Sequence, residues 1–96
     1  MTSKQRAYLR GLANSIDAIF QIGKSGINDN LIVQVSDALE ARELIKISVL
    51  ESAPANAKEL GQILAEETNS TLVQTVGSKI TLYRARKKDS KIVLSK

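Results

Sequence analysis

Residues 18–28 decide the fold of this chain, and they read AIFQIGKSGIN. The first five form a short β-strand pattern, which places Phe20 and Ile22 on one face and Gln21 on the other. A glycine-flanked loop follows at once, and Asn28 after it can cap a helix. A strand that runs through a tight loop into a helix predicts one half of a β-α-β unit.

The loop, Gly23-Lys24-Ser25-Gly26, has the features of an anion-binding site. Its two glycines lack a Cβ, so the main chain can take left-handed dihedrals and a ligand can approach the amides closely. The helix that follows directs its unpaired N–H groups and the positive end of its dipole toward the same place, and Lys24 adds a mobile cation. Such a loop can hold a phosphate backbone, but glycines also mark ordinary strand-to-helix turns. The motif alone leaves both interpretations open.

Two helices are predicted on either side of this strand. Thr2 or Ser3 can cap the first, whose apolar positions recur with the three-to-four spacing of one buried stripe: Leu9, Leu12, Ala13 and Ile16. The second begins after Asn28, with Asp29 in the favourable first turn, and ends at Ala41-Arg42. Each helix is predicted to bury one side.

Residues 44–50 predict a second strand. Apolar and polar side chains alternate along it, so Ile45 and Ile47 face one way while Lys46 and Ser48 face the other. An alternation of this kind is typical of a sheet that has one buried face and one face in contact with water.

A third helix and a hairpin complete the predicted elements. Pro54 ends the second strand, and a capping-box pattern begins at Asn56. The buried stripe of this helix comprises Ala57, Leu60, Ile63 and Leu64. Residues 71–76 and 80–85 are predicted strands, and Gly77-Ser78 between them suits a two-residue turn.

The predicted order is therefore α-β-α-β-α-β-β, in a single small α/β domain that takes in residues 1–96. Two β-α-β crossovers imply parallel strand pairs, and the hairpin adds an antiparallel pair. We expect a mixed four-stranded sheet with its helices mostly on one face.

Charge is unevenly distributed along the chain, whose net charge is +4. Cations dominate residues 1–26 and 79–96, whereas carboxylates dominate residues 27–78. If the first helix, the glycine-flanked loop and the last strand come together, their cations form a basic face opposite an acidic back, which is typical of nucleic-acid binding. The alternative is that the basic end, residues 87–96, is only a solvated tail.

The residue inventory argues against catalysis. The chain contains no histidine and no cysteine, so the commonest general base, the usual transition-metal ligands and the thiol nucleophile are all absent. The loop also lacks the longer glycine spacing of a Walker loop. We expect no enzyme activity, no metal, no cofactor and no small-molecule substrate.

Aromatic residues are few, and they restrict how a nucleic acid could be recognised. Tyr8, Phe20 and Tyr83 are the only ones, which is too few for a platform that stacks several bases. Recognition would depend on phosphates and shape. Tyr83 could stack on one base or bond a phosphate, and it fits a packed position in a strand equally well.

Nothing in the sequence predicts a membrane or secretory protein. No apolar run approaches the roughly 20 residues that span a bilayer, and residues 1–10 lack the apolar core of a secretory signal. The absence of cysteine fits a reducing compartment. We expect a cytoplasmic protein with no membrane partner.

Four blocks of sequence resemble the CRM domain family, in its stand-alone YhbY-like form. The blocks are Lys4-Gln5-Arg6 with Leu9-Arg10, Gln21 to Gly26, Leu39-Glu40 with Glu43 to Lys46, and Leu72-Val73-Gln74 through Gly77 to Leu82-Tyr83-Arg84. The resemblance covers residues 2–86. It implies a fold similar to the C-terminal domain of translation initiation factor three, with a GxxG loop placed as in KH domains.

The family resemblance also implies an RNA-binding protein of ribosome assembly. Its bacterial members associate with precursors of the large ribosomal subunit, so the implied partner is ribosomal RNA, with ribosomal proteins as further partners. By the family motif, the loop contacts the RNA backbone beside cations of the first helix and last strand. The expected RNA-binding residues are Gly23, Lys24, Ser25, Gly26, Lys4, Arg6, Arg10, Arg84 and Arg86. Replacing Gly26 with Asp is expected to weaken RNA binding and to leave the fold intact.

A competing hypothesis is a protein-interaction module. In that case the acidic middle of the chain docks a basic ribosomal protein through Glu40, Glu43, Glu66 and Glu67. Salt-sensitive binding to naked ribosomal RNA favours the first hypothesis. Co-purification with one protein after nuclease treatment favours the second.

Overall fold

A computed structural model describes residues 1–86, and its elements follow the predicted order. They are α1 (Ser3–Ala13), β1 (Ala18–Ile22), α2 (Asp29–Arg42), β2 (Leu44–Val49), α3 (Ala57–Glu67), β3 (Thr71–Val76) and β4 (Lys79–Tyr83). The basic tail predicted at residues 87–96 lies outside the described part of the chain. Among the described helices, none is long and apolar enough to cross a membrane.

Local capping signals set where the helices begin. The Thr2 hydroxyl accepts a hydrogen bond from the Gln5 amide at 3.1 Å, and the Gln5 side chain accepts one from the Thr2 amide at 3.0 Å, which completes a capping box. Asn28 and Asn56 cap α2 and α3, where each side chain accepts from the amide three residues later, at 2.8 and 2.9 Å. The box predicted at Asn56 is only half formed, because the Glu59 carboxylate approaches the Asn56 side chain instead of its backbone.

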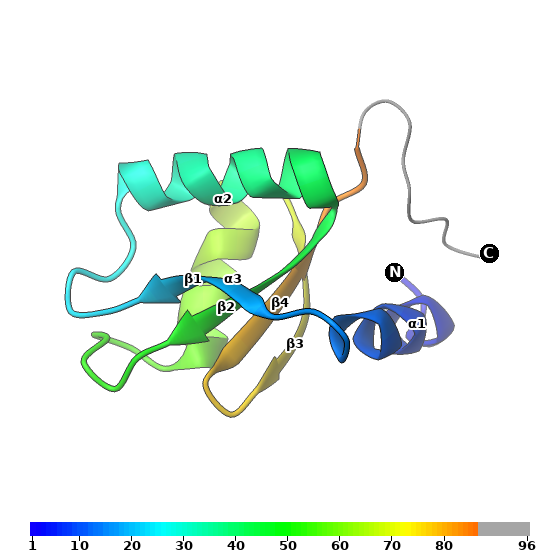
Figure 1. Ribbon diagram of the computed structural model, residues 1–96, viewed down its shortest axis with the longest axis horizontal. Coiled ribbons are helices and arrows are strands. Elements are labelled where there is room, and N and C mark those ends of the chain that lie inside the picture. Colours follow the sequence, from blue (N-terminus) through cyan, green and yellow to red (C-terminus); the bar gives the residue numbers. More distant parts are fainter. Residues whose placement is uncertain (87–96) are drawn as a thin grey trace.

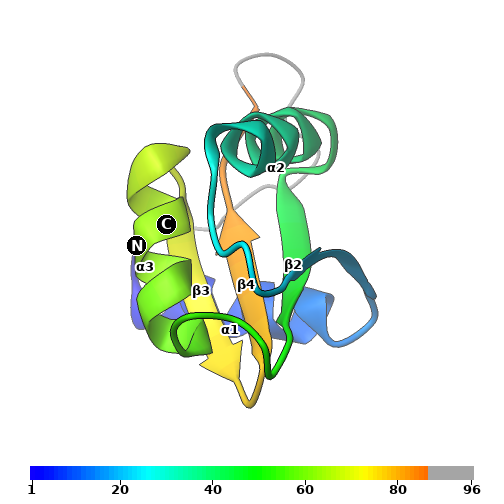
Figure 2. The same cartoon turned by 90° about the vertical axis from the view of Figure 1, so that its left-hand side faces the viewer.

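The four strands form one mixed sheet in the order β1-β2-β4-β3. β1 and β2 are parallel, while β4 is antiparallel to both of its neighbours. The mixed four-stranded sheet is confirmed, but the expectation of two parallel pairs was wrong: β4 turns back at Gly77 and inserts between β2 and β3 (Figure 2). Register shifts interrupt the pairing of the two outer strands, at residues 18–20 and 72–74, whereas β2 and β4 pair without one.

The main core lies between the sheet and the layer formed by α2 and α3. Its buried members come from five elements, β1, α2, β2, α3 and β4: Ile22, Val35, Leu39, Ile45, Ile47, Ala57, Leu60, Leu64, Ile80 and Leu82. Gly61 belongs to the same contact, since a Cβ there would stand 2.9 Å from the Leu72 side chain. Ile63, which was predicted to be buried, is 45% exposed because it lies on the flank of the helix away from that contact. Two of the three helices therefore pack on one face.

α1 packs on the opposite face, near one end of the sheet. Leu9 and Ala13 are fully buried there and form a second, smaller cluster with Leu44, Val73 and Tyr83. Figure 1 shows α1 at one end of the longest axis of the molecule and the β1–α2 loop at the other. The expected arrangement, with the helices mostly on one face, is confirmed.

The remainder of that face carries polar side chains. Ser48 lies opposite Lys79 and Gln21 in the neighbouring strands, and Thr81 lies opposite Lys46 and Gln74. Directly opposite residues share a face of the sheet, and Lys46 and Ser48 alternate with Ile45 and Ile47 of the main core. We call this set the polar sheet surface: Gln21, Lys46, Ser48, Gln74, Lys79 and Thr81.

Candidate nucleic-acid interface

The glycine-flanked loop is a tight turn at the carboxyl end of β1. The Gly26 amide donates to the Gly23 carbonyl at 2.9 Å, which closes the turn and places Lys24 and Ser25 at its exposed tip. Within residues 1–86, the Lys24 side chain makes no hydrogen bond or ion pair. Its ammonium group is therefore available to an external anion.

Gly26 is the glycine on which the loop depends. Its φ of +66° lies in the left-handed region, and a Cβ at this position would stand 2.9 Å from Cγ of Pro54 in the β2–α3 loop. Gly23 has an ordinary φ, and a Cβ there would meet Leu50 at 3.5 Å, which is normal contact. Any side chain at Gly26 therefore strains the loop, so Gly26→Asp is expected to lower stability as well as RNA binding.

An open depression of about 260 Å³ lies beside the loop. It is lined by the loop, the end of β1 and the first turns of α2: Gln21, Gly23, Lys24, Ser25, Gly26, Asn28, Asn30, Leu31 and Gln34. Lys24 is the one charged residue of this lining, and most of the other side chains are carboxamides that can donate and accept hydrogen bonds. The N-terminus of α2 adds the positive end of its dipole. The depression can hold an anion together with polar groups attached to it.

The predicted cations of α1 lie far from this loop. Lys4 and Arg10 are both exposed on the helix, at the end of the molecule opposite to the loop (Figure 1). The five residues of β1 alone separate the two ends by about 17 Å at the usual rise of a strand. The predicted single basic face of first helix, loop and last strand is therefore not assembled as a compact patch.

Arg6 was expected to contact RNA, but it binds the protein's own backbone. Its Nη1 donates to the carbonyls of Leu72 and Val73, both at 2.7 Å, and so ties α1 to β3 at the register shift. The side chain is half-buried in this contact. Arg6 is a structural residue that positions α1.

Arg84 is also engaged within the fold, on the acidic side of the sheet. Its Nη1 donates to the Thr68 carbonyl at 2.7 Å and to the Ser36 hydroxyl at 3.0 Å, and its Nη2 donates to the Ser36 carbonyl at 2.8 Å. These bonds link the middle of α2 to the end of α3, beside Asp37 and Glu40. An arginine held in this way is a cross-link between helices. These bonds weigh against the RNA contact expected of Arg84, which stays a prediction.

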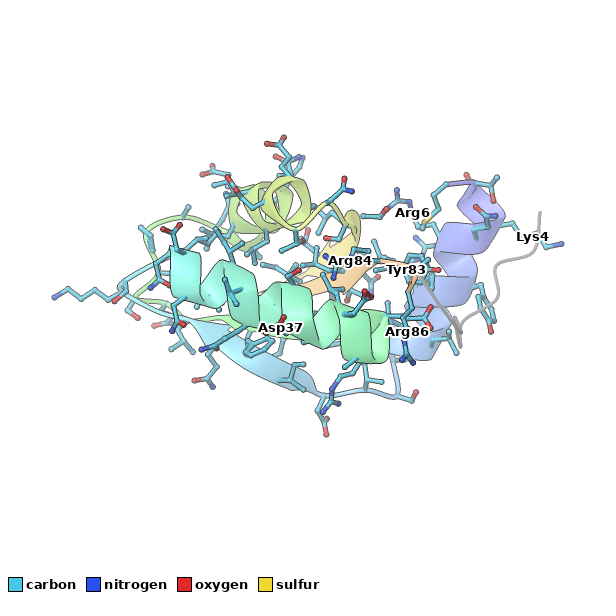
Figure 3. The ribbon with its side chains drawn as sticks, turned by 90° about the horizontal axis from the view of Figure 1, so that it is seen from above. Lys4, Arg6, Asp37, Tyr83, Arg84 and Arg86 are labelled. Atoms are coloured by element: carbon cyan, nitrogen blue, oxygen red, sulfur yellow. The ribbon has the colours of Figure 1, made fainter. Side chains whose placement is uncertain are left out.

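The chain after β4 runs past the C-terminal end of α2 (Figure 1). Arg86 lies half-buried there (Figure 3). Figure 3 also places Lys4 and Arg6 at the α1 end of the molecule. Unlike Arg84, Arg86 makes no hydrogen bond or ion pair within residues 1–86, so its guanidinium is available to a partner.

Two cations, Lys46 and Lys79, lie on the sheet between the loop and α1, and the sequence-based prediction did not include them in the site. Lys46 and Lys79 both belong to the polar sheet surface, and the Lys79 ammonium donates to the Ser48 hydroxyl. The signal for Lys46 was present in the alternation of β2, but its place in the acidic middle of the chain concealed it. Lys79 was counted with the basic end and was not assigned to a face.

Charge is segregated by the two sides of the sheet. The exposed carboxylates on helices are all on α2 or α3: Asp29, Asp37, Glu40, Glu59, Glu66 and Glu67. In the described part of the chain, Asp17 and Glu51 lie on connecting segments, and the polar sheet surface contains no carboxylate. The predicted acidic back is thus the outer surface of α2 and α3.

Glu43 and Tyr83 are buried and belong to the fold. Glu43 is fully buried at the end of α2, where its φ of +67° lets the chain turn into β2. Burial raises the pKa of the Tyr83 hydroxyl above its usual value, and the negative charge of Glu43 raises that pKa further. Glu43 therefore cannot dock a partner protein, and Tyr83 is a packing residue in the cluster under α1.

The fold and this interface define a class: small α/β domains that carry a glycine-flanked cationic loop at the end of a sheet and no aromatic platform on it. A family model for the CRS1 / YhbY (CRM) domain matches residues 1–84. The chain belongs to this family.

Individual relatives agree with that assignment. The chain is 45% identical over 94 residues to the Bacillus subtilis protein named "Probable RNA-binding protein YqeI", with 98% of each chain covered. It is 29% identical to a Haemophilus influenzae protein named "RNA-binding protein", over 88% of this chain and 85% of the relative. The solution structure of the hypothetical protein SAV1595 from Staphylococcus aureus superposes with a TM-score of 0.83 at 53% identity, over 99% of both chains.

Proposed function

We propose that this protein binds RNA through its phosphate backbone and takes part in assembly of the large ribosomal subunit. The observation that carries the proposal is the exposed Lys24-Ser25 tip, set at the N-terminus of α2 in a domain whose relatives are named RNA-binding proteins. A phosphate at this tip gains the Lys24 charge, the helix dipole and closely approachable amides together.

The proposed contact begins at the loop, Gly23 to Gly26. Gly26 holds its shape, and Lys24 and Ser25 reach the phosphate. Lys4, Arg10 and Arg86 extend the contact at the far end of the molecule, where Arg6 positions α1. A site built from cations without a stacking platform favours recognition of backbone and shape over base sequence.

Lys24→Ala tests the loop. The wild type and the variant are compared by filter binding to purified large-subunit ribosomal RNA over a series of salt concentrations. Loss of one phosphate contact should lower the slope of log K against log salt by about 0.7 to 0.9. Lys58→Ala is the matched control, since Lys58 is also exposed but lies on α3, the helix that carries Glu59, Glu66 and Glu67. Equal slopes for wild type and Lys24→Ala would refute the role of the loop.

The assembly role needs a cellular measurement. We expect the protein to sediment in sucrose gradients with particles at or just below the large subunit, and Lys24→Ala to shift it toward the ribosome-free fractions. A wild-type protein found only in the ribosome-free fractions would contradict ribosome assembly even if RNA binding holds in vitro.

A second candidate function is docking of a basic ribosomal protein on the acidic surface of α2 and α3. The exposed carboxylates Glu40, Glu66 and Glu67 support it, whereas Glu43 is removed from this surface by its burial. Under this alternative, one basic protein co-purifies after nuclease treatment, and Glu66→Gln with Glu67→Gln releases it. Loss of every partner on nuclease treatment would contradict it.

A further inference from the structure

We infer that the polar sheet surface is a docking surface for base-paired RNA, and that it joins the loop to α1 in one continuous track. The inference deepens the proposed function and rests on it. It adds Lys46 and Lys79 to the contact and specifies the form of RNA that the surface accepts.

The position of the two lysines is fixed by strand pairing. Lys46 lies opposite Thr81, and Lys79 is two residues before Thr81 on the same strand, so the two lysines are diagonal neighbours. Diagonal neighbours on one face are about 7–8 Å apart. Because β2 and β4 pair without a register shift, both ammonium groups can reach one RNA backbone from a regular part of the sheet.

The surroundings of these lysines suit an anionic partner. Ser48 and Thr81 form a polar floor, with 7% and 1% of their surface exposed, and Gln21 and Gln74 lie on the outer strands beside them. The Lys79 ammonium is held over this floor by the Ser48 hydroxyl and keeps further N–H groups for a ligand. The set contains no carboxylate, so a phosphate that approaches these six side chains meets no like charge among them.

The side chains of this surface also discriminate between forms of RNA. Single strands bind to sheets mainly by stacking on aromatic residues, and the polar sheet surface contains none. Base-paired RNA instead presents phosphates and 2′-hydroxyls across a wide, shallow minor groove. Lysine, serine and glutamine side chains on a broad sheet can bond both kinds of group.

The polar sheet surface lies between the GKSG loop and α1, and this position makes the track continuous. One row of the surface, from Lys79 through Ser48 to Gln21, leads across the sheet to the strand that carries the GKSG loop, and Gln21 also lines the depression beside that loop. The other half of the same face is covered by α1 with its exposed Lys4 and Arg10. The lysines therefore bridge the distance that separates the two predicted groups of cations.

The test uses an RNA hairpin with a stem of about 16 base pairs and a single strand of the same composition without pairing. Lys46→Gln with Lys79→Gln, in the full chain, should weaken binding to the hairpin and lower its salt slope by about two. Binding to the single strand should change much less. Lys58→Gln, on the acidic side, serves as the matched control for loss of a lysine.

Lys24→Ala in parallel separates this inference from the proposed function. If Lys24→Ala weakens hairpin binding and the double variant does not, the sheet surface is not a docking surface, while the loop keeps its role. If the double variant loses single-strand and hairpin binding equally, the preference for base-paired RNA is wrong. If neither variant affects RNA binding, the proposed function fails together with the inference.

A second measurement does not depend on folding of the variants. Titration of the ¹⁵N-labelled wild type with the hairpin should shift the amide resonances of Gln21, Lys46, Ser48, Gln74 and Thr81, and leave those of the outer surface of α3 in place. Shifts confined to the loop would overturn the inference.

Discussion

The two faces of the sheet differ in the helices that cover them and in the polarity of their side chains. The face under α2 and α3 is covered along its length by a continuous apolar core, and the outer surface of those helices is acidic. The other face has a small apolar cluster under α1 and then becomes polar and basic. A helix that covered the second half would bury Lys46 against apolar groups, which costs free energy unless the charge is paired. The difference teaches that one face supplies most of the buried apolar contacts, whereas the polar half of the other face is not covered by any described helix.

The largest effect that this comparison predicts is a loss of stability on the covered face. Leu64 is fully buried in the main core, so Leu64→Ala should lower the free energy of unfolding by about 2–5 kcal/mol through lost burial and a cavity. Lys46→Ala on the polar sheet surface should change it by less than about 0.5 kcal/mol. Urea denaturation measures both. Similar losses for the two variants would break the proposed division between the faces.

The second-largest expected effect comes from a comparison of two arginines, Arg84 on the α2–α3 side of the sheet and Arg10 on the α1 side. Arg84→Ala removes three hydrogen bonds between α2, α3 and the end of β4, so we expect about 1.5–3 kcal/mol of destabilisation, with RNA affinity unchanged in the folded protein. Arg10→Ala, at an exposed position of α1, should have the opposite result. The RNA affinity should fall, and the denaturation midpoint should not change. A variant of Arg84 that loses RNA affinity at full stability would return this residue to the RNA contact.

Gly26 lies in the β1–α2 loop at the end of the sheet, and its substitution should have a smaller effect on stability. Gly26→Ala forces a side chain into the left-handed region, at a cost of about 1–2 kcal/mol, and brings its Cβ within 2.9 Å of Pro54. Gly23→Ala is the control, because a Cβ there meets only normal contacts. Pro54→Ala should rescue part of the loss, since it removes the steric contribution but not the strain in φ. Equal stability of the two glycine variants would show that the turn can relax.

The smallest effect concerns Tyr83, which lies in the α1 cluster on the partly uncovered face. Because its pKa is raised in the folded state, the unfolded chain loses this proton first, and stability should fall as pH rises above about 10. The contribution of this residue cannot exceed about 1.4 kcal/mol per pH unit. Tyr83→Phe should make the free energy of unfolding less dependent on pH above about pH 10. An unchanged dependence would show that the hydroxyl is not desolvated by the cluster.

The elements of the fold could be predicted from sequence because their signals are local. Thr2, Asn28 and Asn56 cap their helices through bonds that reach only three residues along the chain, and the alternation around Lys46 places its side chain without knowledge of any other strand. Strand order is different in kind. Nothing local to residues 79–83 states that β4 inserts between β2 and β3, since that choice depends on how the hairpin packs on the whole sheet.

The candidate site also has a part that local sequence predicts and a part that depends on distant residues. The GKSG loop was predicted from its own residues, and the structure places it as a turn at the start of α2. The internal hydrogen bonds of Arg6 and Arg84 could not be predicted, because the acceptors lie 66 and 67 residues from Arg6 and 48 and 16 residues from Arg84 in sequence. Whether an arginine is held by carbonyls or free for a phosphate depends on such distant partners, and so does the burial of Glu43.

Both outer strands carry an interrupted register, while the two inner strands are regular. A straight outer strand is a template on which another copy of the chain can add its own strand, and β-bulges are one of the ways in which proteins prevent this. On β3, the Arg6 guanidinium also donates hydrogen bonds to two backbone carbonyls at the register shift, so these carbonyls already have a partner. Opposite charges on the two sides of a domain favour contact between copies, and irregular edge strands disfavour the pairing of one sheet with the next.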